Sequence, residues 1–293
     1  MDSTPHSFLD TAALIRGSMP RPRRLWLWYA TLAVVVMILT SIVTAEENPQ
    51  LQAIVRFLSG LLMFAMVLAM GWFASHTLKQ QRREQQRVEA IEELIQLRRW
   101  DHAAGMIQAM LSRPTLTMSG RLQALFYLSG VLARYDRFAD AIVVHDYLLS
   151  HAQFDPITAH GLKLMRAMAL LREDHLVDAD RAMGELRREA PDSAGLALVE
   201  IYRDVKTGHP DEAIEVFKAK SAAIRTQLGH RIADAYILVA RAHDVLDQST
   251  EAAAAYENAT LLTPVEELLR RYPEVRPLRE KYGGAASPRE GVQ

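Results

Sequence analysis

Two long apolar runs without a single charged residue constrain this chain more than any other feature. The first extends from Leu25 to Ala45, and the second from Phe57 to Ser75. A helix of about 20 residues spans about 30 Å, the thickness of the hydrocarbon core of a bilayer. The segment between the two runs, 46–56, allows only a short connection. We therefore predict two transmembrane helices, 25–45 and 57–75, that form an antiparallel hairpin with 46–56 as its external loop.

The charges beside the two runs predict their orientation. Basic residues flank the outer ends of the hairpin: Arg16, Arg21, Arg23 and Arg24 before it, and Lys79, Arg82, Arg83 and Arg87 after it. The short loop carries two glutamates and only one arginine. Because basic segments stay in the cytoplasm, we expect a multi-pass protein of the plasma (inner) membrane with both termini cytoplasmic, and residues 1–24 as a cytoplasmic segment.

Aromatic and basic side chains mark the expected membrane interface. The candidates at this interface are Trp26, Trp28, Tyr29, Trp72, Arg24, Lys79, Arg82 and Arg83. Rings and long basic side chains of this kind favour the headgroup layer. A cleaved signal peptide is the alternative for the first run, but that run is long for one and begins far from Met1. Small residues in the second run, such as Ala65 and Ala69, would suit close packing within the hairpin or formation of a homo-oligomer through it.

Beyond Lys79 the chain reads as helix throughout, with apolar residues at three- and four-residue spacing. Five short stretches of four residues share a form. Each begins with a residue that is mostly bulky and ends in alanine, and the residue directly before the alanine is acidic or polar. The stretches are Trp100–Ala103, Phe138–Ala141, Leu176–Ala179, Pro210–Ala213 and Ser249–Ala252. The alanines recur at intervals of about 34 to 39 positions, which resembles the tetratricopeptide repeat, a helix–turn–helix unit of about 34 residues. The resemblance implies an all-α chain in which an α-solenoid of about five helix pairs, residues 76–264, follows the two transmembrane helices.

Two joints of this array are open to interpretation. No glycine or proline lies between Gly71 and Gly105, which favours one rigid helix from the second apolar run into the first repeat. A flexible joint at 79–86 is the alternative. After the last repeat we expect a capping helix over 265–282, interrupted near Pro273 and Pro277, and a disordered tail over 283–293.

The sequence offers no sign of catalytic or cofactor chemistry. It has no cysteine, which excludes thiol catalysis and thiolate metal sites, and its histidines have no paired spacing typical of metal ligands. It also lacks the glycine-rich phosphate loops and the hydrolase motifs. With 34 basic and 35 acidic residues the net charge is −1, which argues against nucleic-acid binding. We expect no enzyme activity, no cofactor and no metal.

The resemblance to tetratricopeptide arrays implies a concave face, lined by the first helix of each pair, that binds a protein or peptide. The residues carried over to that face are Gln123, Phe126, Arg134, Leu164, Met168, Arg172, Leu198, Tyr202, Lys206, Asp234, Ile237, Arg241 and Asp244. Arg134, Arg172 and Lys206 occupy equivalent positions and would form a basic column for an acidic segment of the partner. The alternative is that these three side chains only solvate helix ends.

These observations predict a non-catalytic scaffold that is anchored in the bilayer and recruits a partner through its cytoplasmic repeats. A second hypothesis is an accessory or assembly subunit of a membrane complex that acts through the hairpin itself.

Overall fold

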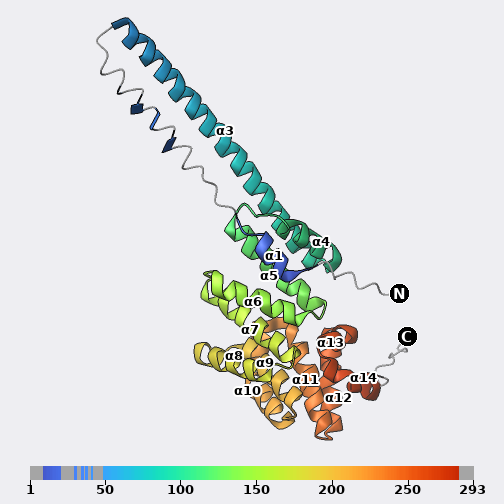
Figure 1. Ribbon diagram of the computed structural model, residues 1–293. Helices are drawn as coiled ribbons and strands as arrows, with labels where there is room; N and C mark the ends of the chain where they lie inside the picture. The colour runs from blue at the N-terminus through green and yellow to red at the C-terminus, as the bar shows by residue number, and fades with distance from the viewer. Residues whose placement is uncertain are drawn as a thin grey trace. The chain divides into compact units, whose positions relative to one another are not determined.

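The computed structural model describes residues 9–20 and 49–283, together with residues 30, 31, 34, 35, 37, 38 and 41 between them; at 49–52, 54–56 and 230 it describes the backbone alone. All regular secondary structure in these residues is helical, as predicted, and comprises thirteen α-helices and two short 3₁₀ helices (Figure 1). The chain divides into two compact units, Met1–Asp136 and Arg137–Gln293.

The first unit contains α1 (Thr11–Gly17), α3 (Pro49–Gln96), α4 (Trp100–Leu111) and α5 (Met118–Arg134). The second contains α6 (Phe138–His151), α7 (Pro156–Arg172), α8 (Leu176–Glu189), α9 (Ala194–Thr207), α10 (Pro210–Leu228), η1 (Gly229–Arg231), α11 (Ile232–Val245), α12 (Ser249–Leu262), α13 (Val265–Arg271), η2 (Pro273–Val275) and α14 (Arg276–Tyr282).

The five alanines of the repeated pattern are all fully buried. Five positions before each of them the backbone turns into the left-handed region, at Arg98 (φ 58°), Asp136 (φ 56°), Asp174 (φ 60°), Gly208 (φ 78°) and Asp247 (φ 58°). The amide that follows such a residue donates back across the turn, as from His175 to the carbonyl of Leu170 at 2.9 Å. This is the Schellman arrangement, which ends one helix and starts the next in a fixed geometry. The predicted succession of helix pairs is therefore confirmed.

One uninterrupted helix of 48 residues, α3, connects the second apolar run to the first repeat. Residues 79–86 lie inside this helix, which agrees with the favoured rigid connection and not with the alternative of a flexible joint. The helix also begins at Pro49, well before the apolar run, which corrects the expectation that 46–56 is entirely loop. Proline is favoured in the first turn of a helix because that turn has no intrahelical partner for an amide hydrogen.

Among the described residues, one helical stretch is long and apolar enough to cross a membrane, judged by length and composition alone. It is Phe57–Gln96, and none of its most apolar part is buried inside the protein. Figure 1 shows this part of α3 projecting beyond α1, α4 and α5. The seven described residues of the first predicted span are helical, and Val34, Val35, Met37 and Ile38 among them are exposed.

A short helix at the N-terminus, α1, packs against the repeats of the same unit, which the sequence did not indicate. Asp10 caps it by accepting a hydrogen bond from the amide of Ala13 at 3.0 Å. The fully buried Arg121 of α5 donates to the carbonyl of Ile15 at 2.7 Å and to the hydroxyl of Ser18 at 3.0 Å. The end of α1 is thus held by a charged donor from a helix far along the chain.

The second unit has one continuous hydrophobic core that includes the C-terminal helices. The predicted capping helix is present over 265–282 but consists of three short pieces, α13, η2 and α14. The break falls at Pro273, as expected, whereas Pro277 lies in the first turn of α14 and starts that helix instead of interrupting it. Residues 284–293 of the predicted tail lie outside the described residues.

Candidate partner-binding face

The residues predicted to bind a partner lie on the first helices of the pairs, but none of them is fully exposed. In the second unit Leu198, Tyr202, Asp234 and Ile237 are buried. The others in that unit, Leu164, Met168, Arg172, Lys206, Arg241 and Asp244, are half-buried. In the first unit Gln123, Phe126 and Arg134 are half-buried as well. Leu198 and Ile237 belong to the hydrophobic core and are not available to a partner.

The chain's own C-terminal segment, Val265–Tyr282, covers much of this face in the second unit. Three successive first helices, α7, α9 and α11, contact it through side chains that the sequence had pointed to. Arg172 of α7 donates to the backbone carbonyl of Arg271. The hydroxyl of Tyr202 on α9 donates to the carboxylate of Glu274 at 2.9 Å. We call the surface that these helices present to the segment the covered face.

On α11, the fully buried Asp234 binds Arg271 of the segment. Its Oδ1 accepts a hydrogen bond from Nη1 of Arg271 at 2.7 Å, and its Oδ2 accepts one from Nε of Arg231 at 3.1 Å. A carboxylate without contact to water needs such charged donors, because otherwise the loss of hydration would not be offset. Arg271 is therefore held by α7 through its backbone carbonyl and by α11 through its side chain.

Near the C-terminal end of α11, Asp244 holds the end of α14. Its Oδ1 accepts hydrogen bonds from Lys281 at 2.7 Å and from the hydroxyl of Tyr282 at 3.2 Å, while Arg241 donates to its Oδ2 at 2.7 Å. Burial by itself would raise the pKa of Asp244. The three donors outweigh burial and hold that pKa below its usual value, so the carboxylate is ionised at neutral pH.

Two tyrosines form the aromatic part of the contact. The rings of Tyr202 and Tyr272 meet edge to face, with their centroids 5.3 Å apart. Burial raises the pKa of both hydroxyls, and the negative charge of Glu274 adds to the effect on Tyr202. Both therefore remain neutral, and Tyr202 acts as a hydrogen-bond donor.

Apolar side chains of the segment complete the contact. Leu268, Tyr272, Val275 and Leu278 are buried and lie at intervals of four, three and three residues, the spacing of one helical stripe. This stripe was visible in the sequence, but nothing there indicated which surface it covers. It is the feature of the face that sequence reasoning missed.

The basic column is engaged within the chain. Arg134 lies over the ring of Trp100 at 5.5 Å, and Arg172 over the ring of Phe138 at 4.6 Å; each ring belongs to the preceding repeat. Lys206 donates to the carbonyl of Leu171 at 2.5 Å. These contacts join neighbouring helix pairs and favour the structural interpretation of the three side chains.

The predicted interface residues of α3 are exposed, as an interfacial position requires. The side chain of Trp72 has 70% of its surface accessible, and Lys79, Arg82 and Arg83 follow on the same helix. Trp26, Trp28, Tyr29 and Arg24 lie outside the described residues.

No cluster of three or more histidine, aspartate or glutamate side chains in the described part of the chain has the geometry of a metal site. The sequence matches no protein-family model, and no curated protein is significantly similar to it.

Proposed function

We propose that this protein is a membrane-anchored, non-catalytic scaffold that recruits a protein partner through the covered face of a tetratricopeptide-like array. The observation that carries the proposal is that this face already holds a short helical segment. It does so through hydrogen bonds and ion pairs from three successive first helices, the mode by which arrays of this kind are expected to bind peptides.

The packing of α1 supports a two-helix hairpin as the anchor. Residues 9–20 and the repeats that hold them lie in one unit, and so on one side of any bilayer that α3 crosses. The chain between them must then cross an even number of times. Leu25–Ala45 is the apolar run that would supply the second crossing, and the flanking arginines and lysine favour a cytoplasmic location of both termini.

The C-terminal segment indicates what kind of partner the face accepts. Buried Asp234 and half-buried Asp244 require basic groups, whereas Tyr202 and the neighbouring Lys206 favour a carboxylate such as that of Glu274. A partner therefore has to carry both charges on an amphipathic helix, not only the acidic residues that a basic column would select. Such a partner binds by exchange with Val265–Tyr282.

Exchange makes the proposal testable with the full-length protein. Leu278→Ala loosens the segment, because removing a fully buried leucine side chain costs about 2–5 kcal/mol. The partner is captured from native membranes by crosslinking, and capture by this variant should exceed that of the wild type. A synthetic peptide with the sequence of 265–282 should then release the partner, whereas the same peptide with Tyr272→Ala and Leu278→Ala should not.

Ile157→Ala provides the matched control, because Ile157 is an apolar residue of α7 with 85% of its surface exposed. Its capture should equal that of the wild type. If the peptide releases nothing and capture is insensitive to Leu278→Ala, the covered face is not the recruitment site. A partner that then requires the apolar residues 25–75 would identify the hairpin as the functional part, as in an accessory subunit of a membrane complex.

A further inference from the structure

A small cavity in the first unit lies where α3 leaves its apolar part and meets the connection between α4 and α5. Its volume is about 280 Å³. Met110 and Thr115, both nearly fully buried, form part of its wall. A cavity of this size is slightly below the range for small-molecule sites and suits a compact group.

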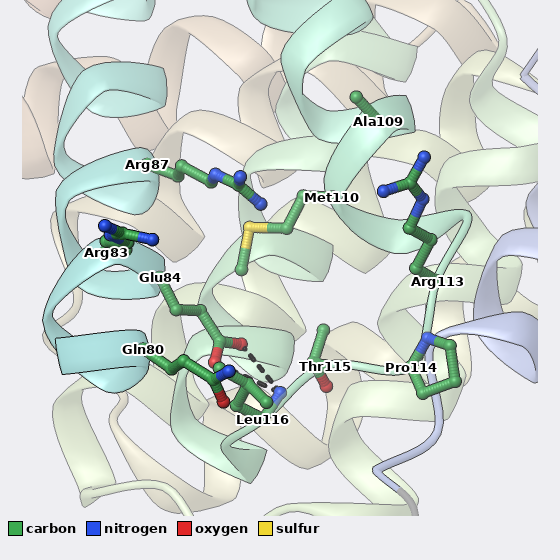
Figure 2. Close-up of a pocket in the computed structure, with 10 residues that line it drawn as sticks. All are labelled: Gln80, Arg83, Glu84, Arg87, Ala109, Met110, Arg113, Pro114, Thr115 and Leu116. Carbon is green, nitrogen blue, oxygen red and sulfur yellow. Dashed lines mark hydrogen bonds between the residues drawn. The ribbon is translucent and has the colours of Figure 1, made fainter. Parts of the chain in front are cut away.

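Three arginines surround this cavity from two sides. Arg83 and Arg87 come from α3, and Arg113 comes from the start of the α4–α5 connection. Figure 2 shows Arg87 reaching from α3 over Met110, with Arg113 on the opposite wall. None of the three makes a hydrogen bond or an ion pair with another residue that the structure describes, and all three are exposed.

The one carboxylate of the cavity, Glu84, attracts Arg87 but can offset only one of the three positive charges. Glu84 is buried, with 7% of its surface exposed, and accepts hydrogen bonds from the amide of Leu116 at 3.1 and 3.3 Å. These bonds direct the carboxylate toward the backbone, as Figure 2 shows. The site therefore carries three positive charges and one negative charge around a space that is open to a ligand.

The positive-inside rule explains only part of this arrangement. Arg83 and Arg87 follow closely on the apolar run, within the distance over which basic residues determine topology. Arg113 lies beyond that distance, on a different element, and yet it lines the same cavity. Its position calls for a reason other than topology.

We propose that this cavity is a binding site for a phosphate group, held by Arg83, Arg87 and Arg113. The planar guanidinium groups match the oxygens of a phosphate and can bind it through paired hydrogen bonds. The inference is independent of the partner-binding face proposed above. The phosphate belongs either to a free anion or to an anionic lipid headgroup, since α3 extends from the cavity directly into its apolar part.

Geometry makes both sources accessible. On a perpendicular helix, Arg83 would stand about 12 Å beyond Ser75, the last residue of the apolar run. The headgroup layer is about 5–8 Å deep on each side of the bilayer, and Gln80, which also lines the cavity, would stand only about 8 Å beyond Ser75, so the lower edge of the cavity reaches that layer. The upper edge remains open to soluble anions.

The test uses the full-length protein in nonionic detergent with two probes: inorganic phosphate, and phosphatidylglycerol compared with phosphatidylcholine. Arg113→Gln removes the arginine that lies far from the apolar run. Arg99→Gln is the matched control, because Arg99 is an exposed arginine at the start of α4, in the same unit, that does not line the cavity. Calorimetry measures phosphate binding, and native mass spectrometry measures retained lipid.

We expect Arg113→Gln to weaken binding of at least one probe tenfold or more, and Arg99→Gln to change it by less than threefold. Binding of phosphate alone identifies a free anion as the ligand, and binding of phosphatidylglycerol alone identifies a lipid headgroup. Equal effects of the two substitutions would show a diffuse basic surface and overturn the proposal, as would the absence of binding by both probes. Circular dichroism confirms that each variant remains folded.

Discussion

Replacing Asp234 by asparagine is expected to loosen the C-terminal segment while leaving the rest of the second unit in place. Asp234 has no exposed surface and holds two arginines, Arg271 at 2.7 Å and Arg231 at 3.1 Å. Asparagine keeps the shape and one acceptor oxygen but removes the charge. Its amide nitrogen then faces one of the two guanidinium groups.

The magnitude follows from these contacts. A hydrogen bond to a charged group contributes about 1.5–3 kcal/mol, and breaking a buried ion pair costs about 3–5 kcal/mol. The side chains of Arg271 and Arg231 are 26% and 48% exposed, so both regain hydration when the carboxylate is lost. We therefore expect a loss of about 2–3 kcal/mol, which corresponds to an opening of the segment that is about 30- to 150-fold more frequent.

Hydrogen exchange of the full-length protein in detergent measures this opening directly. The amide of Tyr272 bonds to the carbonyl of Leu268 at 2.8 Å, so its exchange reports on the docked segment. Protection should fall in 265–282 and remain unchanged in α7 and α8. Asp178→Asn is the control, because Asp178 forms an exposed ion pair with Arg181 that should contribute less than about 0.5 kcal/mol. If the Asp234 variant retains protection within threefold of the wild type, apolar contacts alone hold the segment and the electrostatic reasoning is refuted.

Three further predictions concern other parts of the chain. Arg121→Gln removes the charged donor to Ile15 and Ser18 and should release α1 at a cost of about 3 kcal/mol, seen as faster proteolysis near the N-terminus; unchanged proteolysis would contradict this. Burial lowers the pKa of His145 to about 4, whereas its pKa in the unfolded chain is about 6.5. Because the unfolded chain takes up this proton first, the free energy of unfolding is at its full value above pH 6.5 and falls by about 3 kcal/mol as the pH drops to 4. In denaturation curves His145→Leu should remove this part of the pH dependence. Asp174→Val should destabilise the third helix pair by more than about 1 kcal/mol and Asp174→Gly should not, because φ is 60° there; equal thermal midpoints would refute the strain argument.

The succession of helix pairs could be predicted because its signal is local. An alanine such as Ala179 has to be small wherever two helices cross closely, so its recurrence marks each pair regardless of what lies elsewhere in the chain. The left-handed turns have a second local signal in the sequence, from which their positions were not predicted. In four of the five turns, the left-handed residue is an aspartate or a glycine. These residue types tolerate positive φ better than others, but aspartate is equally common at exposed helix starts.

The docking of the two terminal segments could not be predicted, because it depends on contacts between distant residues. The sequence around Arg121 does not indicate its partner, because the carbonyl of Ile15, to which it donates, lies 106 positions earlier in the chain. Arg172 likewise meets the backbone of Arg271, 99 positions later. Arg121 lies on the apolar stripe of α5, three and four positions before Ala124 and Leu125, but only the tertiary structure shows what its charge meets there, and that Arg172 is covered.

Under the proposal that α3 crosses a bilayer, its continuity has a consequence for how the bilayer and helices α4 and α5 of the first unit are oriented toward each other. Each residue turns a helix by about 100° and advances it by about 1.5 Å. The exposed apolar part of α3 and its buried end, where Val88 and Ile91 are fully enclosed, therefore share one rotational phase. One residue inserted near Lys79 would swing α4 and α5 by about 100° about the membrane normal, provided that α3 stands upright. Seven inserted residues would restore the phase to within about 20° and raise α4 and α5 by about 10 Å. The direction in which these two helices face along the membrane surface is therefore encoded as a residue count, and insertions of one and of seven residues separate the importance of that direction from the importance of height.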